Sequence, residues 1–224
     1  LSTLLVTVEP IQVMPHICCR DKNAIAMRSQ LLGAHINNIN NFLVITGDPI
    51  PSMVRSSVKS VFNFDSVGLM NIISDMNQDQ FADKPVIYGG AINQGRVNFK
   101  VELARVKKKM EAGATFFMTQ PVFSDEDISR LRQIKEETGA RILCGIMPFV
   151  SLRNATFMKN EMTGINVTDE ILARYSADMT KEEGEETGIQ IAKEIITKTS
   201  DFVDGYYFSF PFNRVHMLEK ILNA

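Results

Sequence analysis

Short apolar runs alternate along the chain with longer amphipathic segments. The apolar runs are rich in Val, Ile and Phe, and they occupy residues 11–19, 41–47, 85–91, 116–123, 141–150 and 205–212. Most of them are nearly continuous, which is typical of strands that are buried on both faces of a parallel sheet. The pattern therefore predicts about six strands.

The amphipathic segments between these runs predict helices. They occupy residues 21–36, 64–78, 98–114, 124–140, 152–162, 168–176, 181–199 and 214–224. Gly113 and Gly139 stand where a left-handed glycine would end a helix. Ser124 is placed as an N-cap, with acidic residues following it in the first turn. Repeated strand–helix–strand units predict right-handed crossovers and a parallel sheet.

The positions of polar residues help to distinguish a barrel from an open sheet. No G-x-G-x-x-G motif follows any strand, and the glycines in residues 89–95 have the wrong spacing for one. Polar residues instead follow several strands, at Asp21, Asp48, Gln120 and Asn213. This distribution favours a (β/α)8 TIM barrel, whose catalytic groups come from several strand ends. About six strands are two fewer than a closed barrel needs, so either the sheet is open or the sequence lacks the beginning of the barrel.

Composition and charge exclude some classes of protein. The 224 residues are 45% hydrophobic and 22% charged, as in ordinary folded proteins, and 24 Lys and Arg against 26 Asp and Glu give a net charge of −2. Nucleic acids and anionic membranes usually bind proteins with a basic excess, so we expect neither as a partner. No stretch approaches the roughly 18 apolar residues of a membrane span, and residues 1–10 lack the features of a signal peptide.

The three cysteines are Cys18, Cys19 and Cys144. An odd number, with two of them adjacent, suits neither a disulfide framework nor a zinc site. We therefore expect no metal and a cytoplasmic location, where thiols stay reduced. The motifs of zinc hydrolases, serine hydrolases and P-loop proteins are absent, and no strand ends in a lone lysine suited to Schiff-base chemistry.

Two strand ends carry residues that suit either structure or ligand binding. His16, in PHICCRD (15–21), is either a core histidine bonded to the backbone or a ligand contact at the mouth of the barrel. Asp48, in TGDP (46–49), either begins a turn or accepts hydrogen bonds from the N–H groups of a heterocycle. The sequence by itself leaves both alternatives open.

The helix predicted over 98–114 carries Glu102, Arg105 and Lys109 on one face. This spacing favours a solvated, salt-bridged stripe. A ligand with a diphosphate would give the same residues a function, because Arg and Lys neutralise phosphate and Glu binds sugar hydroxyls. Gln120 lies in an otherwise apolar run, where its amide must bond either the backbone or the edge of a ligand.

Five segments in order resemble the methylenetetrahydrofolate reductase family: PHICCRD, LVITGDP, FDSVGLM, KKKMEAGATFFMTQPVF and GIMPFVSLRNATFMKNE. The resemblance extends to FNR (212–214) and is strongest to the reductase half of bifunctional homocysteine S-methyltransferase/5,10-methylenetetrahydrofolate reductase. It implies one (β/α)8 barrel domain over residues 1–224, N-terminally incomplete, with the first two strands missing and residues 1–3 in the loop after the second strand.

The resemblance also implies an activity. Members use FAD to reduce 5,10-methylenetetrahydrofolate to 5-methyltetrahydrofolate in one-carbon and methionine metabolism. Asp48 matches the aspartate beside the flavin and the folate, which tunes the flavin potential and steadies an iminium cation. Gln120 matches the glutamine that hydrogen-bonds the pterin. Asp48 and Gln120 are therefore the implied catalytic and substrate-binding residues. The alternative is a non-catalytic flavin- or folate-binding module of a larger methyltransferase assembly.

The resemblance also implies which residues contact FAD, some at its flavin and others at its ribose and diphosphate. They are His16, Asp48, Tyr88, Gly89, Gly90, Glu102, Arg105 and Lys109, of which Tyr88, Gly89 and Gly90 are expected at a strand end. The general-acid glutamate of the family lies outside this sequence. Leu152 stands where NADH-using bacterial members have an aromatic residue, so the electron donor stays open between NAD(P)H and a partner flavoprotein or ferredoxin. Homo-oligomers and a fused homocysteine methyltransferase domain are further expectations.

Overall fold

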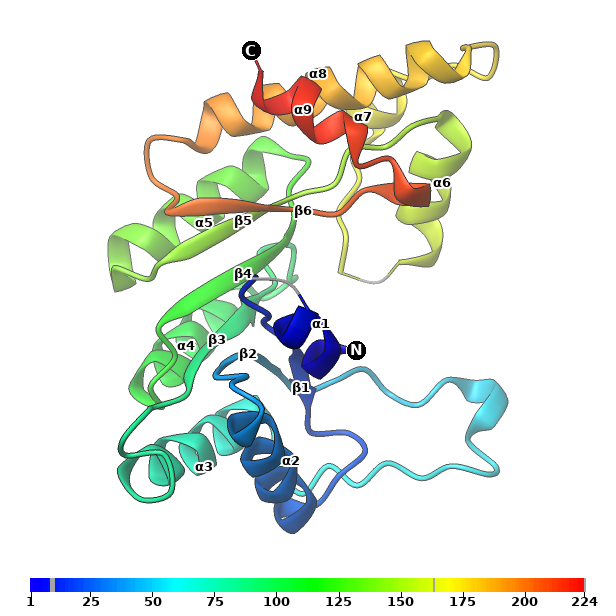
Figure 1. Cartoon of the computed structure of the whole chain (residues 1–224). Helices are drawn as coiled ribbons and strands as arrows, with labels where there is room; N and C mark the ends of the chain where they lie inside the picture. Colours follow the sequence, from blue (N-terminus) through cyan, green and yellow to red (C-terminus); the bar gives the residue numbers. More distant parts are fainter. Residues whose placement is uncertain (9–10, 163, 224) are drawn as a thin grey trace. The chain divides into compact units, whose positions relative to one another are not determined.

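The computed structural model describes residues 1–8, 11–162 and 164–223. Figure 1 shows strands and helices alternating along the chain. The strands are β1 (His16–Cys18), β2 (Asn41–Ile45), β3 (Ile87–Ile92), β4 (Phe116–Pro121), β5 (Ile142–Ile146) and β6 (Gly205–Phe208). Each predicted apolar run coincides with one of them, and β3 continues one residue beyond its run, to Ile92. Most of the strands are shorter than their runs, because apolar side chains continue into the adjoining loops.

The sheet confirms the predicted fold class. The pairs β1–β2, β2–β3, β4–β5 and β5–β6 are parallel, and the strand order is β1-β2-β3-β4-β5-β6. A doubly wound open sheet reverses its order at a switch point, whereas barrel strands follow one another in sequence. The fold is therefore α/β with sequential parallel strands, consistent with a (β/α)8 barrel.

Each predicted helical segment contains a helix. The helices are α1 (Ser2–Val8), α2 (Ala24–Ile36), α3 (Ser66–Gln78), α4 (Phe99–Glu111), α5 (Asp125–Thr138), α6 (Leu152–Glu161), α7 (Asp169–Leu172), α8 (Lys181–Thr199) and α9 (His216–Leu222), with 3-10 turns η1 (Ser52–Val54) and η2 (Pro211–Asn213). The expected loop over residues 1–3 is wrong for Ser2 and Thr3, because α1 begins at Ser2. The residues of α1 include neither Gly nor Pro, the two residues least favourable to a helix. Residue 224 of the last predicted helix lies outside the described residues.

The chain divides into two compact units. The first unit comprises residues 1–91 and 105–116, and the second comprises residues 92–104 and 117–224. A single domain over residues 1–224 stays a prediction.

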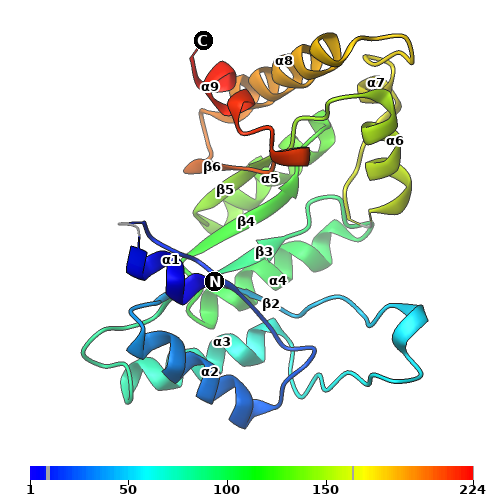
Figure 2. The ribbon, with the colours of Figure 1, turned by 45° about the vertical axis from the view of Figure 1, so that its right-hand side comes forward.

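In the first unit, α2 and α3 lie side by side (Figures 1 and 2). Asn23 and Asp65 cap them by accepting hydrogen bonds from Ala26 and Gly68 N–H groups. Their buried faces include Met27, Leu31, Leu69, Met70 and Ile73. Between β2 and α3, residues 51–63 are exposed throughout and form the long cyan loop of Figure 1.

In the second unit, α8 packs closely on the segment that follows β5. Side chains on Gly184 and Gly188 would lie only 2.3 and 2.0 Å from the carbonyl oxygens of Val150 and Phe149. Glycine at these two positions, one turn apart, therefore allows the helix to reach the backbone. The α9 helix lies beside α8 (Figures 1 and 2). The described helices include none long and apolar enough to cross a membrane.

The predicted helix ends are confirmed in detail. Gly113 and Gly139 have φ values of +92° and +66°, in the left-handed region that favours glycine. The Ser124 hydroxyl accepts a hydrogen bond from the N–H of Asp127, as expected of an N-cap.

Candidate functional site

His16 and Gly89 lie in one row across the sheet of the first unit. His16 pairs with Leu43, which in turn pairs with Gly89. Paired positions in a parallel sheet present their side chains on the same face. His16 is exposed at the beginning of β1. It is therefore not a buried core histidine, and its flavin contact stays a prediction.

Asp48 lies in the loop that follows β2, and within the described residues no hydrogen-bonded turn begins at it, so the turn that the sequence predicted is not found. Gly47 has a φ of +95°, and a Cβ there would lie 2.1 Å from the Cys18 Sγ, so glycine is needed on both counts. Arg20 donates to the backbone oxygen of Asp48 at 3.4 Å while its own ion pair is with Asp21, at 2.6 Å.

The carboxylate of Asp48 is exposed. It has no hydrogen bond or ion pair in the described part of the chain. Of the two interpretations of TGDP, the turn is therefore not found, and the binding of a heterocycle by the carboxylate stays a prediction.

Tyr88 and Gly89 do not lie at the carboxyl end of their strand, so that expectation is wrong. They are the second and third residues of β3, which continues to Ile92. The Tyr88 hydroxyl is buried and donates to the backbone oxygen of Ala112, at 2.8 Å. A side chain on Gly89 would meet the ring of Phe116 at 2.4 Å. The phenol of Tyr88 therefore serves packing against the end of α4, and flavin contacts by this segment stay a prediction.

Lys109 is buried beside the part of β3 that belongs to the first unit. It is 4% exposed, and its Nζ donates to the backbone oxygen of Ala91 at 2.5 Å. Arg105, one turn earlier on α4, is half-buried. The guanidinium of Arg105 has no hydrogen bond or ion pair among residues 1–8, 11–162 and 164–223. It is a cation available to an anionic ligand.

Glu102, in the second unit, holds the loop that follows β3. It is 2% exposed and accepts a hydrogen bond from the N–H of Asn93 at 3.0 Å, and it lies 3.6 Å from the guanidinium of Arg96. The solvated stripe favoured by the spacing on α4 is therefore wrong, because Glu102 and Lys109 are both buried. Spacing along a helix does not reveal which face is covered.

Gln120, at the end of β4, has a fixed backbone and an available side chain. Its N–H and carbonyl both bond the side chain of Gln94. Its side-chain amide is half-buried and has no hydrogen bond within the described residues. A side chain on Gly164 would come within 3.9 Å of the Gln120 Cδ and 3.5 Å of the Asn93 Nδ2, so both amides border this glycine.

Sequence reasoning missed Asn93 and Gln94. The Asn93 Oδ1 is buried and has no hydrogen-bond partner in the part of the chain that the structure describes, and Gln94 is 1% exposed. The two polar residues directly after an apolar strand, in AINQG (91–95), were the available signal. They were considered only as part of a glycine motif.

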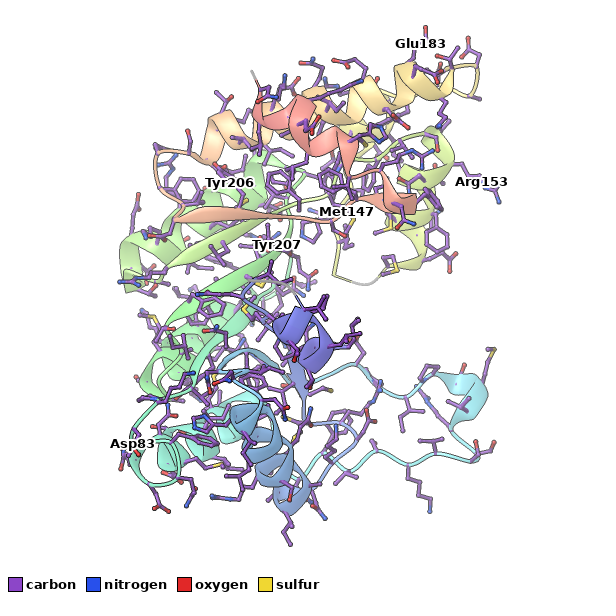
Figure 3. All side chains as sticks on the ribbon, in the orientation of Figure 1. Asp83, Met147, Arg153, Glu183, Tyr206 and Tyr207 are labelled. Atoms are coloured by element: carbon purple, nitrogen blue, oxygen red, sulfur yellow. The ribbon has the colours of Figure 1, made fainter. Side chains whose placement is uncertain are left out.

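Two adjacent tyrosines of β6 point to opposite faces (Figure 3). The Tyr206 hydroxyl bonds Ile196 of α8, whereas the Tyr207 hydroxyl donates to the backbone oxygen of Thr119. Burial raises the pKa of Tyr207 to about 12, so its hydroxyl stays protonated at neutral pH. Tyr207 therefore holds the strand that carries Gln120.

Leu152 lines a cavity of about 590 Å³ in the second unit. Residues at the beginnings of α6 and α8 border the cavity, together with Phe212 and Arg214 beyond β6. The lining also contains Arg153, which points outward from α6 (Figure 3). The cavity combines apolar walls with basic side chains, as in many ligand sites.

The cysteines are free thiols. Burial is the main cause that raises the pKa of Cys19 and of Cys144 to about 12. Both therefore stay protonated and poorly nucleophilic at neutral pH. In the described ranges, no group of three or more His, Cys, Asp or Glu side chains could hold a metal ion.

The fold and these strand-end residues define the class as an α/β, TIM-barrel-like protein. In agreement, the chain is similar to the crystal structure of 2,3-dimethylmalate lyase, with a TM-score of 0.53 and 11% identity over 99% of this chain and 62% of that one. At this identity the likeness shows the fold alone.

A family model described as methylenetetrahydrofolate reductase matches residues 2–223. The chain therefore belongs to the methylenetetrahydrofolate reductase family, as its motifs predicted. It is 23% identical to the 5,10-methylenetetrahydrofolate reductase of Salmonella typhimurium (strain LT2), over 96% of this chain and 70% of that protein. It is 27% identical to the enzyme of the same name from Buchnera aphidicola subsp. Schizaphis graminum, over 67% of this chain and 50% of that protein. The match and both names support classing the chain as an enzyme.

Proposed function

We propose that the chain reduces 5,10-methylenetetrahydrofolate to 5-methyltetrahydrofolate with FAD as cofactor, in one-carbon and methionine metabolism. The match of the family model to residues 2–223 carries this proposal. The side chains of Asp48, Arg105 and Gln120 support it, because each lacks a hydrogen-bond partner within the described residues and stands at a position implied to contact a ligand.

The residues on α4 and beside it fit a nucleotide cofactor. Arg105 is a cation without a partner among the described residues, and Lys109 supplies a second positive charge beside the Ala91 carbonyl. We assign the FAD diphosphate to these two residues, because phosphate is bound by guanidinium and ammonium groups. The Asn93 Oδ1, which is buried and has no partner within the described residues, fits a hydroxyl donor such as a ribose hydroxyl, and the Asn93 N–H donates to Glu102 on α4. When bound, the flavin supplies hydride-transfer chemistry.

Asp48 and Gln120 are proposed to act on the folate. The carboxylate of Asp48 would stabilise a positive iminium on the substrate by charge pairing, which is strong where water is excluded. The amide of Gln120 offers both a donor and an acceptor, which suits the edge of a pterin. Asp48 would thus lower the energy of the cationic form of the folate, and Gln120 would orient its pterin.

The remaining assignments extend this proposal. The reductant is NADH, NADPH or a partner electron-transfer protein, and the cavity beside Leu152 is where we would look for it first. We also propose a homo-oligomer, a cytoplasmic location and a fused homocysteine methyltransferase domain, as in the bifunctional proteins that the sequence resembles.

The test is the visible absorption spectrum of the full-length protein, followed by anaerobic titration with 5-methyltetrahydrofolate. We expect a flavin spectrum that bleaches as the folate is added. A protein that is colourless and cannot be reconstituted with FAD would overturn the proposal. A bound flavin that never bleaches would support the non-catalytic module instead.

A further inference from the structure

Gln94 pairs with the backbone of Gln120 as a neighbouring strand would. It lies two residues beyond the end of β3 and is 1% exposed. Its Oε1 accepts a hydrogen bond from the Gln120 N–H at 3.1 Å, and its Nε2 donates to the Gln120 carbonyl at 2.9 Å. A side-chain amide thus replaces a peptide group and holds both polar atoms of one residue.

The ladder between β4 and β5 is irregular around Gln120. The pairing of β4 with β5 is regular at Met118, and its register shifts before Pro121. Register shifts leave strand residues without their ladder bonds. The Thr119 hydroxyl also donates to the Gln120 carbonyl, at 2.7 Å. The peptide is therefore held from two sides where the ladder is irregular.

Gln94 is itself held by α5. The Arg130 Nη1 donates to the backbone oxygens of Gln94 and Arg96, at 2.8 and 3.2 Å. The guanidinium also forms an ion pair with Glu126 at 2.5 Å. A chain of contacts thus runs from α5 through Arg130 and Gln94 to Gln120. All of these residues belong to the second unit.

The backbone of Gln120 is held by hydrogen bonds, but within the described ranges its side chain is not. Its amide has no hydrogen bond in the described part of the chain. A fixed backbone with an unpaired side chain is a preorganised arrangement, in which a ligand need not restrict the main chain when it binds.

We infer that Gln94 is a positioning residue that sets the orientation of the Gln120 amide toward its ligand. The inference rests on the proposed function, in which that ligand is the pterin of the folate. Without the clamp, the Gln120 peptide can rotate and carry the amide out of register with the pterin edge. Displacements of about 1 Å are enough to lower binding and rate strongly.

The first test is a double-mutant cycle on the full-length, flavin-loaded protein. Gln94→Met keeps an unbranched side chain of similar length but removes both hydrogen bonds, and Gln120→Ala removes the amide. We expect Gln94→Met to weaken equilibrium binding of 5-methyltetrahydrofolate at least fivefold and to raise KM more than it lowers kcat. In the Gln120→Ala background, Gln94→Met should change folate affinity less than twofold. An unchanged affinity, or the same loss in both backgrounds, would overturn the inference.

Two further measurements separate positioning from folding and from the proposed function. Hydrogen exchange at the Gln120 N–H needs no ligand, and it should accelerate in Gln94→Met but not in Gln190→Met, a control at an exposed glutamine of α8. Unchanged exchange would refute the clamp even if the wild type reduces folate. If Gln94→Met does not fold, Gln94→Glu retains the acceptor for the Gln120 N–H, and it should show an intermediate loss of affinity. A wild type without flavin chemistry would overturn the proposed function but not the clamp.

Discussion

The hydroxyl of Tyr88 stands in the space that a side chain on Gly113 would occupy. A Cβ at Gly113 would lie 2.2 Å from the Tyr88 oxygen, and that oxygen donates to the backbone carbonyl of Ala112 at 2.8 Å. A residue on the third strand and the glycine that ends the following helix are therefore fitted to each other. Glycine is therefore required at position 113 for two reasons: the backbone is left-handed there, and the Tyr88 hydroxyl leaves no room for a Cβ.

Gly113→Ala should destabilise the protein more than Gly139→Ala. Both glycines follow a helix in the left-handed region, which costs an alanine about 1–2 kcal/mol. Only Gly113 has a neighbour within 4 Å of the added Cβ, so its alanine should also break the Tyr88 hydrogen bond, at a further cost of about 1 kcal/mol. The measurement is urea unfolding of both variants. Equal midpoints would contradict the close fit.

Lys109→Met should weaken retention of FAD at least tenfold, while Lys108→Met should leave it unchanged. The two lysines are adjacent on α4, but Lys109 is 4% exposed and bonds the Ala91 carbonyl, whereas Lys108 is exposed. Methionine keeps most of the buried length and removes the charge that is proposed to face the diphosphate. Flavin occupancy after dialysis measures the effect. Equal occupancy in both variants would assign Lys109 to structure alone.

Asp48→Asn should leave FAD bound but slow folate reduction at least tenfold, which corresponds to about 1.4 kcal/mol of barrier. The substitution removes the charge that would pair with the iminium and keeps the size of the side chain. Asp21→Asn is the matched control at the neighbouring strand end, since that carboxylate is paired with Arg20 at 2.6 Å. The measurement is the rate of flavin bleaching by 5-methyltetrahydrofolate. If Asp48→Asn bleaches as fast as the wild type, the charge-pairing role is wrong.

Glu185 should make the stability of the second unit depend on pH in the acid range. It accepts hydrogen bonds from Arg214 at 2.5 Å and contacts the His216 Nε2 at 3.0 Å. The bond to His216 and then that to Arg214 lower the pKa of Glu185 below its ordinary value of 4.5, against an opposing effect of burial. A lowered pKa stabilises the folded state above the ordinary pKa, and this stabilisation is lost as pH falls through the folded value.

Glu185→Gln should therefore lower the free energy of unfolding at pH 7 by about 2 kcal/mol, as expected for a charged hydrogen bond. It should also flatten the fall in stability below about pH 4.5, the ordinary pKa of this carboxyl group. Glu186→Gln is the control, because its carboxylate is exposed and, among the described residues, accepts a hydrogen bond from Gln190 alone. Chemical unfolding between pH 3 and pH 7 gives both curves, and identical profiles for the two variants would refute the prediction.

The sequence predicted the elements well, because hydrophobic periodicity and helix caps are local. The six strands follow from apolar runs, and Gly139 and Ser124 act as their positions suggested. It failed where burial depends on distant residues. Glu102 and Lys109 look like an exposed stripe by spacing, yet both are covered. Tyr88 was placed at a strand end by the resemblance, although the apolar run over 85–91 already continued beyond it, as β3 does.

The polar residues that matter most for the candidate site were the least visible. Gln94 and Asn93 have their roles only because β4 comes beside their loop and its ladder is irregular there. A register shift depends on the neighbouring strand, so the residues of β4 alone do not predict it. Gln120 was found by resemblance, whereas its clamp required the structure.

The pairing of neighbouring strands in chain order has a consequence for synthesis on the ribosome. β1 pairs with β2, β2 with β3, and β5 with β6, so each new strand can be added to one already made. Each apolar strand of the nascent chain can then pair with an earlier strand as soon as it leaves the ribosome. It need not wait until the C-terminus has been synthesised. Synonymous codons that slow translation after β2 or β5 should thus be tolerated, because the segments already released have partners to pair with.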